Sequence, residues 1–148
     1  MLAMPIIGSL LVLLIVFATI FSSNQAHQKQ TLQEAEIEAV AGNFMIYRNI
    51  VSAYAESNPA MTGAVTDLSL GLPTWYQRQP GMGNYLVGGK SYVFLTTALP
   101  GLVGTLAERS QSMGVGINSG GWLKSPIAGN TGIPLPAQVP QSAVVIVQ

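Results

Sequence analysis

The chemistry that this sequence first suggests is nucleotide binding. Gly89-Lys90-Ser91 matches the end of the phosphate-binding loop of many ATPases and GTPases. That loop has another glycine five residues earlier, where this chain has Asn84, and it leads directly into a helix. Residues 91–97 are instead β-branched and aromatic, which is typical of a strand. The spacing and the following segment therefore argue against an NTPase.

The glycine pair fits a β-hairpin better. Strand-like runs at residues 84–87 and 90–95 flank Gly88-Gly89. A two-residue type I′ turn needs positive φ at both central positions, which glycine adopts readily. We predict a hairpin here, with Lys90 as an exposed strand residue.

The other titratable residues form no recognisable catalytic pattern. His27 is the one histidine, and it is far in sequence from the serines that a triad with Asp67 would need. A zinc site would need further ligands, and the chain has no cysteine. The spacing of Glu56, Asp67 and Glu108 brings no two carboxylates together. We predict no catalytic residue, no metal site, no cofactor and no enzymatic activity.

The charge content also limits the function. Charged residues make up 8% of the chain, and six Lys and Arg balance six Asp and Glu. A protein that neutralises phosphates needs a basic surface, which this balance does not provide. We therefore expect no nucleic-acid partner.

The N-terminus predicts a membrane anchor. Residues 2–21 carry no charge, and a helix of this length spans the ~30 Å hydrocarbon core of a bilayer. A cleaved signal peptide would need a basic start and small residues before its cleavage site, where this chain has Asn24. A prepilin leader ending at Gly8 would place glutamate where Leu13 stands. We predict an uncleaved, single-pass anchor at residues 1–23, with the C-terminal domain outside the cytoplasm.

A long amphipathic helix should follow the anchor. Residues 25–57 contain no proline, and the helix should end at Ser57-Asn58-Pro59. Six apolar residues recur at intervals of three and four, which places them on one helix face: Ile37, Val40, Phe44, Tyr47, Val51 and Tyr54. This face favours packing on the chain's own sheet, with a coiled coil as the alternative. Residues 24–36 lack the pattern and are predicted to form a helical stalk.

Residues 37–148 are predicted to form a soluble α+β domain, in which the long helix packs on a small, mostly antiparallel sheet. Residues 115–117 and 122–123 should pair across the turn between them, and 102–113 should form a short helix. Residues 143–147 read as a terminal strand that is buried on both faces or awaits a partner edge.

Two segments are less regular. Residues 68–76 contain Pro73 and suit an irregular strand, an edge strand or a short helix. Residues 125–140 hold four prolines, and we predict an ordered loop or binding strap without a regular element.

The aromatic residues supply the one candidate site. Most of them are expected in the core: Trp75, Tyr76, Tyr85, Tyr92, Phe94 and Trp122. Trp75, Tyr76 and Arg78 also form a candidate interface, because Trp, Tyr and Arg dominate binding hot spots. For Trp75 we favour the core and keep the interface as the alternative.

Four features together carry a family resemblance: the anchor at residues 2–21, the helix end at residues 47–59, the run Leu72-Pro73-Thr74-Trp75-Tyr76-Gln77-Arg78-Gln79-Pro80-Gly81, and Tyr92-Val93-Phe94. Over nearly the whole chain, their order resembles the small PilM-type family of conjugative, plasmid-encoded thin pili (type IVb). The resemblance implies an inner-membrane accessory component of pilus assembly, with no catalytic residues. It does not extend to the actin-like cytoplasmic ATPase of the same name.

Two functions therefore compete. The first is a membrane-anchored structural or accessory protein whose periplasmic domain contacts other pilus-assembly proteins and whose anchor contacts inner-membrane lipid. The alternative is a pilin-like subunit within the fibre, since a hydrophobic helix followed by an α+β head is also pilin architecture. An anchored hydrolase lacks a site, and homo-oligomer formation is left open.

Overall fold

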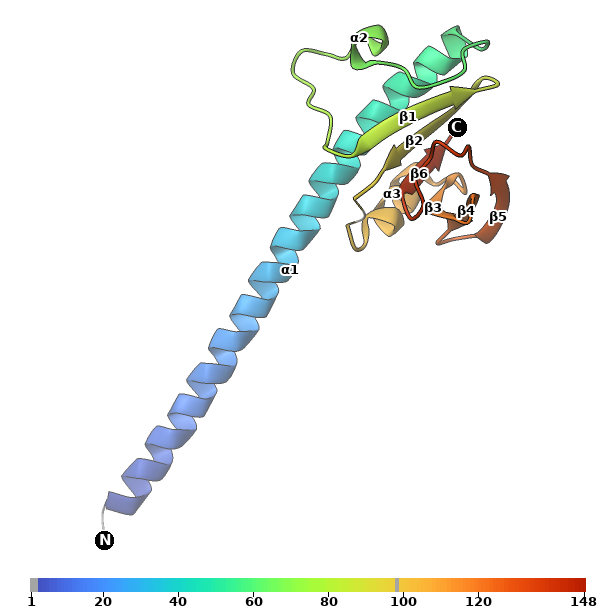
Figure 1. Ribbon diagram of the computed structural model, residues 1–148. Helices are drawn as coiled ribbons and strands as arrows, with labels where there is room; N and C mark the ends of the chain where they lie inside the picture. Colours follow the sequence, from blue (N-terminus) through green and yellow to red (C-terminus); the bar gives the residue numbers. More distant parts are fainter. Residues whose placement is uncertain (1–2, 98) are drawn as a thin grey trace. The chain divides into compact units, whose positions relative to one another are not determined.

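The computed structural model describes residues 3–97 and 99–148, with side chains from Gln28 onward. The chain divides into two compact units, Met1–Glu36 and Ile37–Gln148. Helix α1 runs over Ala3–Ser57 (Figure 1). The predicted end of this helix at Ser57 is confirmed.

The side chains of the predicted anchor, residues 1–23, are outside the part of the chain that the structure describes. Within the part of the chain that is described, no helix has both the length and the apolar character needed to cross a membrane. The predicted stalk is helical along residues 24–36, and its side chains are exposed from Gln28 to Glu36.

The second unit contains one six-stranded sheet in the order β1-β2-β6-β3-β4-β5, and each neighbouring pair is antiparallel. The strands are β1 (Met82–Val87), β2 (Lys90–Leu95), β3 (Val115–Ser119), β4 (Trp122–Ser125), β5 (Gly129–Pro134) and β6 (Val144–Val147). This arrangement confirms the α+β class with a long helix on an antiparallel sheet. The C-terminal strand β6 is inserted between β2 and β3, with Val144, Val145 and Ile146 buried, which is the first of the two alternatives for this strand.

The predicted hairpin is confirmed. Gly88 and Gly89 have φ of 58° and 74°, and Val87 pairs with Lys90 across the turn. Lys90 is exposed and begins a strand, so the helix that a phosphate-binding loop requires is absent from this place.

The second half of α1 packs on one face of the sheet. Val40, Phe44, Tyr47 and Val51 are buried there, while Ile37 and Tyr54 at the two ends of the predicted face are half-buried. The core also includes side chains of α3 (Leu102–Ser110), β2 and β6: Leu102, Leu106, Val93 and Ile146. The opposite face is covered by residues 135–143, which contribute Leu135, Val139 and Ala143 to a second cluster around Leu123 and Val145.

The segment after α1 contains the short helix α2 (Asp67–Leu70), which decides among the three alternatives for residues 68–76. The hydroxyl of Thr66 accepts a hydrogen bond from the Ser69 N–H at its start. Gly71 ends it with φ of 63°, a left-handed conformation that favours glycine.

Three sequence-based predictions were wrong. Helix α3 ends at Ser110 rather than at Met113, because Gln111 adopts a left-handed conformation, and Met113 is exposed. Residues 125–140 were expected to lack regular structure, yet they contain β5. Trp75 and Trp122 were expected in the core, yet they are 69% and 49% exposed.

Candidate interaction surfaces

Tyr76 links the α1 helix to the loop before β1. Its hydroxyl donates to the side-chain oxygen of Asn43 on α1 at 2.7 Å and lies 3.1 Å from the Asn43 carbonyl oxygen. The Asn43 amide in turn donates to the carbonyl of Gln77 at 2.7 Å. Tyr76 is 8% exposed, and its ring lies parallel to that of Tyr47, with centroids 6.3 Å apart. These contacts fix the loop on the helix.

The electrostatic environment of Tyr76 follows from this burial. Desolvation raises the pKa of its hydroxyl to about 12, and the nearby Tyr47 acts in the same direction. The positive charge of Arg78 acts against this shift without cancelling it. The Tyr76 hydroxyl is therefore neutral at physiological pH and remains a hydrogen-bond donor.

Arg78 contacts the edge strand of the sheet. Its guanidinium donates to the carbonyl of Met82 on the edge strand β1 at 2.8 Å and forms an ion pair with Asp67 at 3.3 Å. It also lies 5.8 Å from the centroid of the Tyr47 ring, within the range of a cation–π contact. Arg78 is thus engaged in contacts within the domain.

Trp75 is the most exposed member of the predicted trio, at 69%, whereas Tyr76 is buried and the Arg78 side chain is 37% exposed. Its ring meets Tyr76 edge-to-face, with an interplanar angle of 80° and centroids 6.2 Å apart. It borders a depression of about 440 Å³ against α1, whose lining includes Ala39, Gly42 and Ile46. We call Trp75, Ala39, Gly42 and Ile46 the Trp75 surface.

The surroundings of this surface are electrically balanced. Glu38, which also lines the depression, forms an ion pair with Arg109 of α3, and Arg78 pairs with Asp67. Each of these charges has an opposite charge beside it, and the four residues of the Trp75 surface carry no charge themselves.

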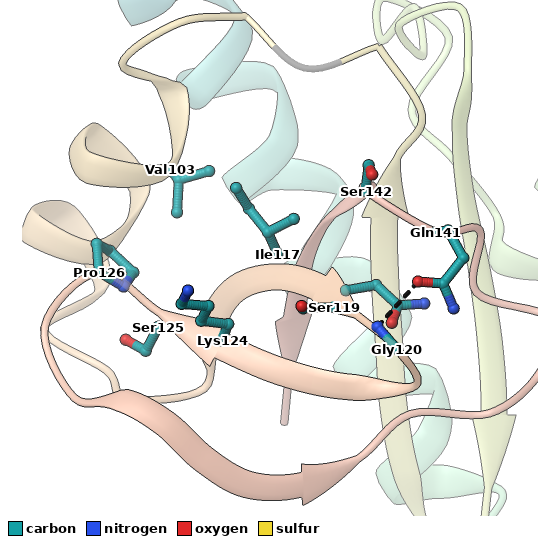
Figure 2. Close-up of a pocket in the computed structure, with 10 residues that line it drawn as sticks. Val103, Ile117, Ser119, Gly120, Lys124, Ser125, Pro126, Gln141 and Ser142 are labelled. Carbon is teal, nitrogen blue, oxygen red and sulfur yellow. Dashed lines mark hydrogen bonds between the residues drawn. The ribbon is translucent and has the colours of Figure 1, made fainter.

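A second hollow, of about 470 Å³, lies beside α3 (Figure 2). Val103 of α3, Ile117 and Ser119 of β3, Lys124 and Ser125 of β4, and Ser142 before β6 contribute to its lining, and we call these six residues the Lys124 hollow. No pattern in the sequence predicted this hollow. The paired glycines between β3 and β4 were its one local signal, since they place Ser119 and Lys124 on neighbouring strands.

From Gln28 to Gln148, leaving out residue 98, no group of three His, Cys, Asp or Glu side chains could hold a metal ion. His27 lies outside the residues whose side chains are described. Asp67 pairs with Arg78 rather than with another carboxylate.

The unit from Ile37 onward is an α+β domain in which a helix packs on an antiparallel sheet. Residues 11–147 match the family model PilM, and the chain therefore belongs to the PilM family. Membership of this family points to a part in pilus biogenesis.

Two crystal structures support the assignment. A candidate PilM protein from Escherichia coli B7A is similar with a TM-score of 0.60 and 28% identity, over 78% of this chain and 94% of that one. A candidate PilM protein from Pseudomonas aeruginosa 2192 gives a TM-score of 0.51 and 31% identity, over 76% of this chain and 95% of that one. No curated protein matches the chain significantly.

Proposed function

We propose that this protein is an inner-membrane accessory component of conjugative thin-pilus (type IVb) assembly, and that it acts through protein–protein contacts. The uncharged stretch at residues 2–21 is long enough to anchor it. The domain from Ile37 onward then lies in the periplasm, where it contacts other pilus-assembly proteins. The protein has no enzymatic activity and binds no nucleic acid.

One observation carries this proposal: Trp75 is 69% exposed, although the adjacent Tyr76 is buried and hydrogen-bonded to Asn43. An exposed tryptophan on a rigid base loses little side-chain freedom on binding, which is the property of a binding hot spot. Because the adjacent charges are paired within the domain, the surface suits an apolar segment of a partner protein.

Deletion of the gene tests the proposal at the level of the pilus. We expect a deletion strain to lack pili on electron micrographs, while an immunoblot shows normal levels of the pilin. Expression of the full chain from a second locus should restore the pili. Normal piliation in the deletion strain would contradict the proposal.

A pilin-like subunit is the second candidate function. The observation that favours it is α1 itself, a single 55-residue helix whose second half packs on the sheet. Mass spectrometry of the protein from native membranes separates the two candidates. An anchor retains residues 2–8, whereas a processed pilin is trimmed after Gly8, and recovery from sheared pili would add support for the pilin.

A further inference from the structure

The part of α1 that belongs to the domain carries almost no charge on its outer side. Arg48 is the one charged residue from Ala39 to Ala55, and its Nε atom is buried. The helices that cover a domain normally bear charged and polar residues on the side away from the core, and a helix without them is typical of a buried position. This part of α1 therefore has the composition of a helix that is covered on both sides.

The outer side presents a regular line of residues. Five residues at intervals of three and four lie along it, and we call them the outer seam: Ala39, Gly42, Ile46, Asn49 and Ala53. Gly42 is half-buried, and the other four are exposed. The same spacing forms the contact line of a two-stranded coiled coil. The seam is separate from the line of residues that packs on the sheet.

Gly42 is not required by the packing of its own domain. Glycine in a helix interior is destabilising relative to alanine. A Cβ atom at this position would meet the Arg109 guanidinium at 3.8 Å, an ordinary contact, and no other atom of the described residues within 4 Å outside the helix backbone. Because the domain leaves room for a side chain here, the glycine suits the close approach of another backbone.

Two properties of the seam indicate that this other backbone is a second copy of the chain. A twofold contact places the same surface against itself, so a net charge on that surface would repel. The seam carries no charge, and the adjacent Glu38 is paired with Arg109.

Asn49, within the seam, is suited to meet its own counterpart. Its Oδ1 accepts a hydrogen bond from Arg48 at 3.0 Å, whereas its amide N–H groups have no partner among the described residues. An asparagine side chain is both donor and acceptor, so two Asn49 side chains can bond to each other across a twofold axis. A single asparagine pair of this kind fixes the register of a coiled coil.

We propose that α1 of one copy packs along α1 of a second copy, in parallel and in register, through the outer seam. The parallel direction rests on the proposed function, in which both N-termini are anchored in one membrane. The depression beside Trp75 is lined by Ala39, Gly42 and Ile46, so the second copy is also the partner of the Trp75 surface. Anchoring in one membrane raises the effective concentration of the copies and thereby favours a contact through a short seam.

Single cysteines test this contact, because the chain has none. In the full-length protein in native membranes, treated with copper phenanthroline, Ala53→Cys should form a disulfide-linked dimer on a non-reducing gel. In an antiparallel pair centred on Ile46 the two cysteines would lie about 21 Å apart, too far for a disulfide. Lys90→Cys, at the exposed start of β2, is the control for random collision and should crosslink about tenfold less.

A charge placed in the seam provides the second comparison, made in the Ala53→Cys protein. Ile46→Lys, at a position that is 37% exposed, should reduce the crosslinked fraction about tenfold or more, because two like charges then meet. Leu68→Lys, at a position that is 93% exposed and outside the seam, should leave the fraction unchanged. Circular dichroism of both purified variants shows that the domain remains folded.

Two results would overturn the proposal: crosslinking of Ala53→Cys no greater than that of Lys90→Cys, or an equal effect of Ile46→Lys and Leu68→Lys. Failure of the proposed function has a different signature, which is normal piliation in the deletion strain. A strain that needs this protein for pili, but in which Ala53→Cys forms no dimer, would show that the Trp75 surface contacts a different protein.

Discussion

Tyr76 is the residue on which the candidate interface depends. Its hydrogen bonds to Asn43 and its stacking on Tyr47 hold the loop against α1. The adjacent Trp75 then meets the edge of the Tyr76 ring and remains exposed. A buried tyrosine thus positions an exposed tryptophan, and substitutions at the two positions should have different effects.

Tyr76→Phe should destabilise the domain by about 1–2 kcal/mol at pH 8, because the Asn43 oxygen loses its donor. Denaturant unfolding, followed by circular dichroism, measures this loss. Tyr85→Phe is the matched control, since the Tyr85 hydroxyl makes no hydrogen bond within the described residues. Equal stability of the two variants would contradict the role of Tyr76.

The raised pKa of Tyr76 adds a pH dependence. The folded-state pKa of about 12 lies above the ordinary value of 10.0, so the folded protein holds this proton more tightly than the unfolded chain. The contribution of Tyr76 to stability is therefore complete below pH 10 and is lost as the pH rises toward 12. Between these values, unfolding titrations should show a smaller decline for Tyr76→Phe than for the unsubstituted protein.

Asn84 is a second buried polar residue that fixes the loops. It is 5% exposed, donates to the Tyr47 hydroxyl and the Val65 carbonyl, and accepts from the Val65 N–H. Asn84→Ala should cost about 2–3 kcal/mol, because it leaves buried groups unsatisfied. Thermal unfolding should show this loss as a lower midpoint temperature. Asn130→Ala, at an exposed position, should change the midpoint temperature little. Similar midpoint temperatures for the two variants would contradict the structural role of Asn84.

At the scale of elements, a strand could be predicted from the sequence where its own residues favour the conformation that strand pairing requires. The β1–β2 hairpin was predictable because Gly-Gly permits both positive φ values and the flanking residues favour strands. Strand β5 was not predictable in this way, because its sequence GNTGIP has little intrinsic strand preference. Its conformation comes from pairing with β4, which an irregular register interrupts between Trp122 and Lys124.

The hairpin supplies a prediction for backbone conformation. Replacing Gly88 and Gly89 together by alanine should destabilise the domain by about 2–4 kcal/mol, since a left-handed conformation costs each non-glycine residue roughly 1–2 kcal/mol. Gly88→Asn should be tolerated, because Asn-Gly suits a type I′ turn. Chemical denaturation measures the stability of both variants. A double-alanine variant as stable as the unsubstituted protein would show that the turn can adopt another conformation.

At the scale of the molecule, the sheet order and the Lys124 hollow were beyond reach of the sequence. Insertion of β6 between β2 and β3 depends on long-range pairing. The hollow combines Val103, Ile117, Lys124 and Ser142, whose proximity results from that order. The candidate interface at residues 75, 76 and 78 stays a prediction, and the sequence could not show that Tyr76 is buried while Trp75 and Arg78 are exposed.

The membrane topology can be tested because the chain has no cysteine. We expect Ala137→Cys, at an exposed loop position, to react with a membrane-impermeant maleimide in cells with a permeabilised outer membrane and an intact inner membrane. A cytoplasmic protein with its own cysteine serves as the control for an intact inner membrane. Labelling that requires disruption of the inner membrane would place the domain in the cytoplasm.

The central claim is that the Trp75 surface makes a contact required for pilus assembly. Its most direct test is the number of pili per cell, on electron micrographs, in a deletion strain that produces the Trp75→Ala protein. Leu68→Ala is the matched control, because Leu68 is 93% exposed and lies outside this surface. Truncation of a hot spot costs about 2 kcal/mol or more of binding free energy. We predict loss of pili with Trp75→Ala at normal protein levels and normal pili with Leu68→Ala, whereas normal piliation with Trp75→Ala would contradict the claim.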